Sequence, residues 1–194
     1  MQVAEEESNS KFTLFRGDYS EKKNEIERFG IQAEKRWSES GLPHQDWLNL
    51  TKSLPEALPF TAKEQIIKHV LKPEGWRSPF VSFTRKKDAA RQYAFGREKR
   101  KEGLLITTTI SAVKKYYLQF ESFGESVILL DKPAILLDNL GRRWIHLRNV
   151  PFSIAGNMAR GMEDFYNNIN QDDEFLLLGD LRPGEFTGIN FKLF

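Results

Sequence analysis

Alternation of apolar and polar residues, together with runs of β-branched and aliphatic residues, predicts several short strands. Alternation at every second position places the apolar side chains on one face, which is typical of a half-buried strand. Most of these segments lie in the second half of the chain. We expect strands at residues 11–16, 78–83, 103–110, 125–130, 144–147, 174–178 and 188–194, with a weaker candidate at 133–137.

Helical patterns dominate the region from residue 19 to residue 75. Residues 24–29 are a candidate helix, and an apolar stripe at helical spacing over 66–71 follows the capping-box sequence TAKE at 61–64. Another helix is expected at 88–96, where a glycine ends it. Because helices lie mainly in the first half and strands mainly in the second, the pattern predicts an α+β fold rather than a doubly wound sheet.

Length and composition fit a single domain. The chain has 194 residues, and 40% of them are hydrophobic, which is near the average for globular proteins. Residues 1–10 are acidic and polar, so we expect a flexible, solvated tail there. The domain then covers residues 11–194, with 20–75 mainly helical.

The charge and the residue types present exclude several kinds of protein. There are 29 basic and 27 acidic residues, a balance that disfavours a nucleic-acid-coating protein. There is no cysteine, which excludes disulfides and thiolate metal sites. The sequence contains no run of 18 apolar residues, so no membrane-spanning helix is expected. The acidic start lacks the features of a secretory signal peptide.

Three short motifs place a polar residue on or beside an apolar strand. Their sequences are LFRGD at 14–18, FVSFT at 80–84 and DDEFLLLGDLRP at 172–183. The candidate functional residues are therefore Arg16, Ser82 and Glu174, in this order. Neither a dinucleotide-binding Gly-x-Gly-x-x-Gly nor a phosphate-binding P-loop sequence is present.

This succession of motifs resembles the cholera-toxin-like, or R-S-E, class of mono-ADP-ribosyltransferases. In that family, Arg-Gly/Ala-Asp ends the first strand, and Ser-Thr-Ser or Ser-x-Thr precedes a helix with Ala-x-x-Phe/Tyr-Ala. The third motif is Glu/Gln-x-Glu, followed by an apolar strand, a glycine and a proline. Here ARQYA at 90–94 follows the serine motif, and Gly179 and Pro183 follow Glu174. His69-Val70 also matches a pair found upstream of the serine motif in many members.

The resemblance runs from about Phe12 to Ile189 and implies a split β-sandwich of two small antiparallel sheets. It implies NAD⁺ as substrate, bound between the sheets, and no metal. An arginine fork suits phosphate oxygens, and a carboxylate stabilises the oxocarbenium-like ribose formed when the nicotinamide bond breaks. It implies that Glu174 and Ser82 act at the ribose. The residues expected to bind NAD⁺ are Arg16, Gly17, Asp18, Ser82, Thr84 and Tyr93.

The acceptor is expected to be an arginine side chain of a target protein. In the family, the residue two positions before the catalytic glutamate influences acceptor choice, and here that residue is Asp172. Aspartate keeps the negative charge that accompanies arginine acceptors, with a shorter reach. Phe165 or Tyr166, in the place of the family's substrate-recognition loop, is expected to contact the target. The resemblance further implies a monomeric bacterial toxin or effector, secreted or injected, that acts in the cytoplasm of a host cell.

Other interpretations remain open. The chain could be an NAD⁺ glycohydrolase that uses water as the acceptor. It could instead be a degenerate binding module, since Asp172 and the central Phe83 of the serine motif depart from the family pattern. A nucleic-acid acceptor is disfavoured by the nearly neutral charge. Taken singly, Arg16 could merely pair with Asp18, and we expect a structural hydrogen-bonding role for His69.

Overall fold

The computed structural model describes residues 3–34, 68–69, 77–96, 101–122, 125–129, 134–149 and 171–192. Most of the region expected to be helical lies outside the described residues, and so does most of the apolar stripe at 66–71. The segment 157–170, with Phe165 and Tyr166, lies wholly outside them.

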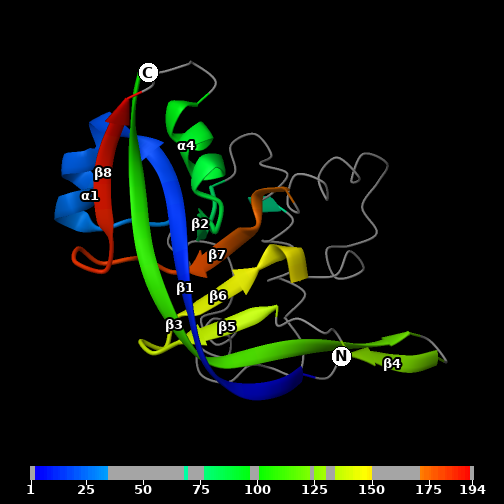
Figure 1. Ribbon diagram of the computed structural model, residues 1–194. Helices are drawn as coiled ribbons and strands as arrows, with labels where there is room; N and C mark the ends of the chain where they lie inside the picture. Colours follow the sequence, from blue (N-terminus) through cyan, green and yellow to red (C-terminus); the bar gives the residue numbers. More distant parts are fainter. Residues whose placement is uncertain are drawn as a thin grey trace.

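Eight strands and four helical segments make up the described part (Figure 1). The strands are β1 (Val3–Tyr19), β2 (Phe80–Thr84), β3 (Glu102–Ser122), β4 (Glu125–Leu129), β5 (Ile135–Asp138), β6 (Arg143–His146), β7 (Glu174–Leu178) and β8 (Thr187–Lys192). The helical segments are η1 (Ser20–Lys22), α1 (Lys23–Phe29), α4 (Lys87–Phe95) and η3 (Leu147–Asn149). Each strand expected from the sequence is present, with bounds that shift by a few residues or, for the first and third strands, extend much further.

The strands are antiparallel and join into a closed ring. Hydrogen-bonded neighbours follow the order β1-β2-β7-β6-β5-β3, and β3 pairs again with β1. Strands β4 and β8 also pair with β3, outside this ring. The fold is therefore mostly β with a few helices, an α+β arrangement, but its strands form one six-stranded antiparallel ring instead of the two separate sheets that we expected.

Strand β1 begins at Val3, so the expectation of a flexible tail over residues 1–10 is wrong for residues 3–10. These residues pair with β3, starting at Val3 opposite Leu118. Glu6 and Glu7 lie opposite Lys115 and Lys114, and opposite charges across a strand pair stabilise the pairing. Residues 3–10 lack apolar alternation, and their partner strand is about a hundred residues away in the sequence. Neither feature can be recognised from the local sequence, which is why this part of β1 was not predicted.

The core lies inside the ring. Leu14 of β1 and Ile106 of β3 are fully buried and pack with aromatic side chains from the opposite strands. Those aromatic side chains are Phe83, Trp144 and Phe175. The Trp144 indole donates a hydrogen bond of 3.0 Å to Asp138, so the polar atom of this buried ring is satisfied.

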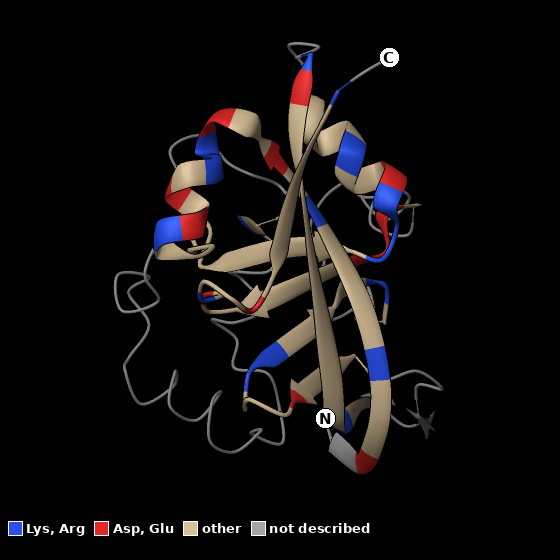
Figure 2. Cartoon of the chain, turned by 60° about the vertical axis from the view of Figure 1, so that its left-hand side comes forward, with Lys and Arg blue, Asp and Glu red and all other residues tan. Residues whose placement is uncertain are grey.

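Helix α4 packs against β1 through small residues. Ala90 and Ala94 are fully buried, and a Cβ atom added at Gly17 would lie 1.8 Å from the Ala90 carbonyl oxygen. Gly17 thus leaves room for the helix backbone, and the expected contact of Gly17 with NAD⁺ stays a prediction. In Figure 2, charged residues are frequent along the helices, whereas most of the strand length consists of other residues. No helix in the described ranges is long and apolar enough to cross a membrane.

Candidate functional site

Three neighbouring strands bring Arg16, Ser82 and Glu174 together. In the β2–β7 pair, Thr84 lies opposite Glu174 and Ser82 opposite Leu176, so the Ser82 and Glu174 side chains project from the same face. The Ser82 hydroxyl donates a hydrogen bond to Glu174 Oε1. From β1, Arg16 Nη1 donates to the Ser82 carbonyl oxygen over 3.1 Å. The three candidate residues therefore form one connected cluster.

His69 completes this cluster from a part of the chain that lies next to β2. Its ring is buried, and Nε2 lies 2.9 Å from Ser82 Oγ and 3.4 Å from Glu174 Oε1. Its Nδ1 contacts the Ser78 hydroxyl, and the Phe80 ring packs edge-on against the imidazole at 5.7 Å. The ring is thus held on both nitrogens, which fits the structural hydrogen-bonding role that we expected.

The contacts of Ser82 fix one donor of the His69 ring. The Ser82 hydroxyl has one proton, which it donates to Glu174, so Nε2 of His69 must donate to Ser82. On the other side of the ring, the Ser78 hydroxyl contacts Nδ1 of His69 and donates to the Phe80 carbonyl oxygen over 3.2 Å. A directed chain of hydrogen bonds runs from His69 through Ser82 to the Glu174 carboxylate.

Asp18 orients Arg16. Its Oδ2 lies 3.3 Å from Arg16 Nη2, while Oδ1 accepts the Tyr19 backbone N–H and lies 3.4 Å from Lys22 Nζ. Asp18 is buried and its described contacts are within the protein, and the expected contact with NAD⁺ stays a prediction. Among the described residues, the buried Nε of Arg16 has no hydrogen-bond partner. Nη1 and Nη2 each carry a second N–H beside the one bound to Ser82 or Asp18, so the guanidinium keeps donor capacity for an anion.

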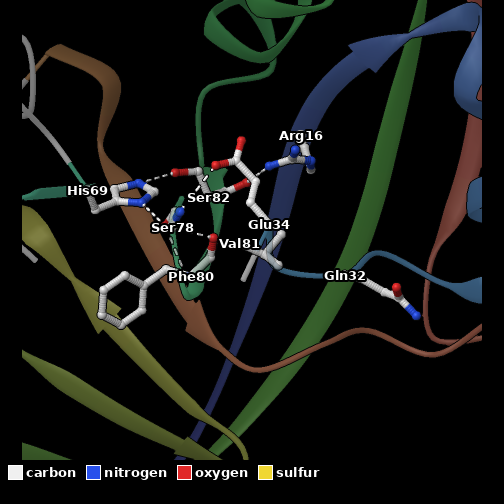
Figure 3. Close-up of a pocket in the computed structure, with 8 residues that line it drawn as sticks. All are labelled: Arg16, Gln32, Glu34, His69, Ser78, Phe80, Val81 and Ser82. Atoms are coloured by element: carbon white, nitrogen blue, oxygen red, sulfur yellow. Dashed lines mark hydrogen bonds between the residues drawn. The ribbon is translucent and has the colours of Figure 1, made fainter. Parts of the chain in front are cut away.

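A pocket of about 280 Å³ opens beside this cluster (Figure 3). Its described lining residues are Arg16, Gln32, Glu34, His69, Ser78, Phe80, Val81 and Ser82. Glu34 Oε2 accepts the Ser78 backbone N–H over 3.1 Å, and its carboxylate lies near Ser82 and Arg16 in Figure 3. Gln32, Glu34 and Ser78 were not predicted, because they lie outside the three motifs and only the fold brings them here.

Thr84, Tyr93 and Asp172 form a separate set of contacts beside the pocket. The Thr84 hydroxyl donates to the Asp172 carbonyl oxygen, and the Tyr93 hydroxyl donates to Asp172 Oδ2 over 2.6 Å. Neither Thr84 nor Tyr93 is among the described lining residues of the pocket. They hold Asp172 in place at the start of β7, and a direct contact with NAD⁺ remains a prediction for both.

The surroundings of Tyr93 raise its pKa well above the ordinary value. Partial desolvation is the first cause, followed by the hydrogen bond to Asp172 and the negative charges of Asp172 and Glu174. Since the residue as a whole is 57% exposed, we give the hydrogen bond and the carboxylates more weight than burial. Tyr93 therefore stays protonated and remains a donor to Asp172.

Phe83, the unusual central residue of the serine motif, belongs to the core. It is 2% exposed and packs edge-on against Trp144 at 5.4 Å. Neighbouring residues of a strand point to opposite faces, so this large side chain does not disturb Ser82.

No protein-family model matches this sequence, and no curated protein is significantly similar to it. Across the described residues, no group of three or more His, Asp and Glu side chains is arranged to hold a metal ion. Chemistry without a metal remains a prediction.

Proposed function

We propose that this protein cleaves NAD⁺ at the nicotinamide–ribose bond and transfers ADP-ribose to a target protein. The observation that carries the proposal is the hydrogen-bonded cluster of His69, Ser82 and Glu174 beside Arg16. The motifs suggested Arg16, Ser82 and Glu174 from positions far apart in the chain. Arg16 and Ser82 line one pocket, and Glu174 is hydrogen-bonded to Ser82 at its edge, which supports a shared role.

The cluster suits a reaction in which positive charge develops on a sugar. When the C1′–nitrogen bond of NAD⁺ breaks, its electron pair leaves with nicotinamide and C1′ becomes oxocarbenium-like. The Glu174 carboxylate would accept a hydrogen bond from a ribose hydroxyl and stabilise that charge. The acceptor then forms a bond to C1′ and releases a proton to solvent. Ser82 and His69 would keep the carboxylate aimed at the ribose.

Arg16 is suited to the diphosphate of NAD⁺. It lies next to the glutamate cluster, and its remaining N–H donors match phosphate oxygens. At about 280 Å³ the pocket is slightly smaller than the roughly 300–1,000 Å³ of typical small-molecule sites. We therefore infer that the described residues enclose the half of NAD⁺ that contains the scissile bond.

The strand arrangement is compatible with a split β-sandwich. Only one residue pair, Phe15 opposite Thr84, joins β1 to β2, so the ring is weakly closed at this point. On one side of it lie β1, β3 and β8, and on the other β2, β7, β6 and β5. We propose that these two groups are the counterparts of the two sheets of the ADP-ribosyltransferase fold, with the candidate site beside the β1–β2 junction.

We propose an arginine side chain of a target protein as the acceptor. The Asp172 carboxylate lies two residues before Glu174 and would pair with a guanidinium. A role as a monomeric bacterial toxin or effector in the host cytoplasm is part of this proposal and follows from the family resemblance.

Hydrolysis of NAD⁺ by water is the second candidate. The Tyr93 hydroxyl already binds one oxygen of the Asp172 carboxylate, so an arginine acceptor must share this carboxylate with Tyr93. Without a suitable target, water is the available acceptor.

A labelling experiment separates the two candidates. Host-cell lysate is incubated with NAD⁺ labelled in the adenylate phosphate and with wild-type protein or Glu174→Gln. Transfer predicts a labelled protein band with the wild type alone, and mass spectrometry locates ADP-ribose on an arginine. Hydrolysis predicts free labelled ADP-ribose without a band. If neither product exceeds the Glu174→Gln level, the proposed function is wrong.

A further inference from the structure

A second cavity lies on the opposite face of β7 from Glu174. Residues alternate between faces along a strand, so Asp173 and Phe175 point away from the Glu174 side. Both line this cavity of about 260 Å³, which shares no described lining residue with the pocket at Arg16. It is a separate space, and nothing in the proposed NAD⁺ chemistry uses it.

Three cationic side chains from separate parts of the chain line this second cavity: Arg85, Lys115 and Arg148. Arg85 Nε lies 3.6 Å from Asp173 Oδ2, and the Arg85 side chain is half exposed. Within the described ranges, neither Lys115 nor Arg148 lies at ion-pair distance from a carboxylate. Asp173 is the one carboxylate in the described lining, so three cations face one anion there, an excess of about two positive charges. Glu6 lies opposite Lys115 across the β1–β3 pair but is not part of this lining and reduces the excess from outside.

A buried histidine builds one wall without adding to this charge. His146 Nε2 lies 2.6 Å from Asp173 Oδ1, and the Asn149 amide lies 2.9 Å from Nδ1. Desolvation lowers the pKa of His146, as do Arg85 and Arg148, against the opposing effect of Asp173. The ring is therefore neutral near pH 7 and rigidly held, since it also stacks on Phe175 at 4.2 Å.

Apolar side chains form the rest of the wall. Phe12 and Phe175 pack with ring centroids 6.1 Å apart, and Leu136 lies beside them. The Arg85 guanidinium lies 5.9 Å from the centre of the Phe12 ring. The cavity thus combines an apolar surface with cations at its edge, the combination that binds a ligand with an apolar body and an anionic group.

We propose that this cavity binds a phosphate monoester with an apolar or aromatic body. A phosphate monoester carries close to two negative charges at pH 7, which matches the excess positive charge of the lining. Arginine and lysine are the usual phosphate ligands in proteins, and Phe12 and Phe175 would contact the body of the ligand. This site is independent of the NAD⁺ pocket and stands whether or not the proposed enzymatic function is correct.

Phenyl phosphate is a suitable probe. It is titrated into the full-length protein while the ¹⁵N and ¹H signals of the His146 ring are followed by NMR. We expect a saturable shift of these signals, and weaker binding of both inorganic phosphate and uncharged phenol. Lys115→Gln and Arg148→Gln should each raise the dissociation constant of phenyl phosphate at least fivefold. Lys114→Gln is the matched control, because Lys114 lines a different hollow beside Glu7, and it should bind as the wild type does.

Three outcomes would overturn the proposal. The first is the absence of a saturable shift of His146 with phenyl phosphate. The second is wild-type affinity in both Lys115→Gln and Arg148→Gln. The third is loss of binding in Arg16→Gln, which would assign the anion to the other pocket.

Discussion

Ser82 contacts its neighbours in the candidate site through both its side chain and its backbone. Its hydroxyl meets Glu174 and His69, and its carbonyl oxygen accepts a hydrogen bond from Arg16. Sequence motifs pointed to Arg16, Ser82 and Glu174, but they did not indicate that Ser78 holds the far side of His69. That contact depends on how His69 packs beside β2, and no spacing rule predicts it.

Ser78→Ala should disturb the site without removing any residue of the Ser82–Glu174 pair. The variant removes the hydroxyl that contacts His69 Nδ1, so the ring is no longer held from this side. We expect kcat for nicotinamide release to fall about tenfold, with little change in KM, because one hydrogen bond contributes about 1 kcal/mol. ¹⁵N NMR of the His69 ring reads the change at Nδ1 directly. Ser78→Thr keeps a hydroxyl and should restore both the spectrum and the rate; equal spectra for wild type and Ser78→Ala would refute this supporting role of Ser78.

His146 should make stability depend on pH. Its pKa in the folded state is lowered, so as the pH falls through the ordinary value near 6.5 the unfolded chain binds a proton before the folded one does. The stabilisation is complete above this value and is lost as the pH falls below it. Urea unfolding of the wild type should therefore show a lower free energy at about pH 5.5 than at about pH 7.5. His146→Asn should reduce this difference, and an unchanged difference would contradict the argument.

At the scale of elements, local patterns identified the strands but not their full lengths. The segment EFLLL at 174–178 is strand β7 with the bounds that we expected, because a continuous apolar run is typical of a buried strand. Strands β1 and β3 extend beyond their apolar parts, since paired glutamates and lysines continue the ribbon. Helix α4 also agrees closely with the prediction: it ends at Phe95, and Gly96 caps it with a positive φ of 61°.

The contact between α4 and β1 gives a test at this scale. Gly17→Ala places a Cβ atom 1.8 Å from the Ala90 carbonyl oxygen, and backbone cannot move aside cheaply. We expect a loss of at least about 3 kcal/mol in unfolding free energy, measured by denaturant titration. Gly188→Ala is a fair control, because its Cβ meets only the end of the Leu104 side chain at 3.3 Å. That variant should lose no more than about 1 kcal/mol; equal losses in both variants would show that the close approach of α4 is unimportant.

At the scale of the whole molecule, the sequence predicted an α+β protein but not a ring. Closure depends on the pairing of β1 with both β3 and β2, contacts between distant residues that leave no local pattern. The candidate site likewise combines residues that local patterns indicate with residues that only distant contacts bring together. Arg16, Ser82 and Glu174 were predicted from short motifs, whereas Gln32, Glu34 and the second cavity depend on how the ring brings strands and loops together.

The central claim is that this ring of strands positions Glu174 to cleave NAD⁺. The most direct test is the release of nicotinamide from NAD⁺, followed by chromatography, with purified wild type, Glu174→Gln and Glu185→Gln. Glu185 is the matched control, since its carboxylate binds Arg142 and the Arg182 backbone N–H, whereas that of Glu174 binds Ser82 and His69. We predict that Glu174→Gln lowers kcat by at least about a hundredfold, as loss of one charge-stabilising group does, while Glu185→Gln keeps the wild-type rate. Nicotinamide release that is absent from the wild type, or equal in wild type and Glu174→Gln, would contradict the claim.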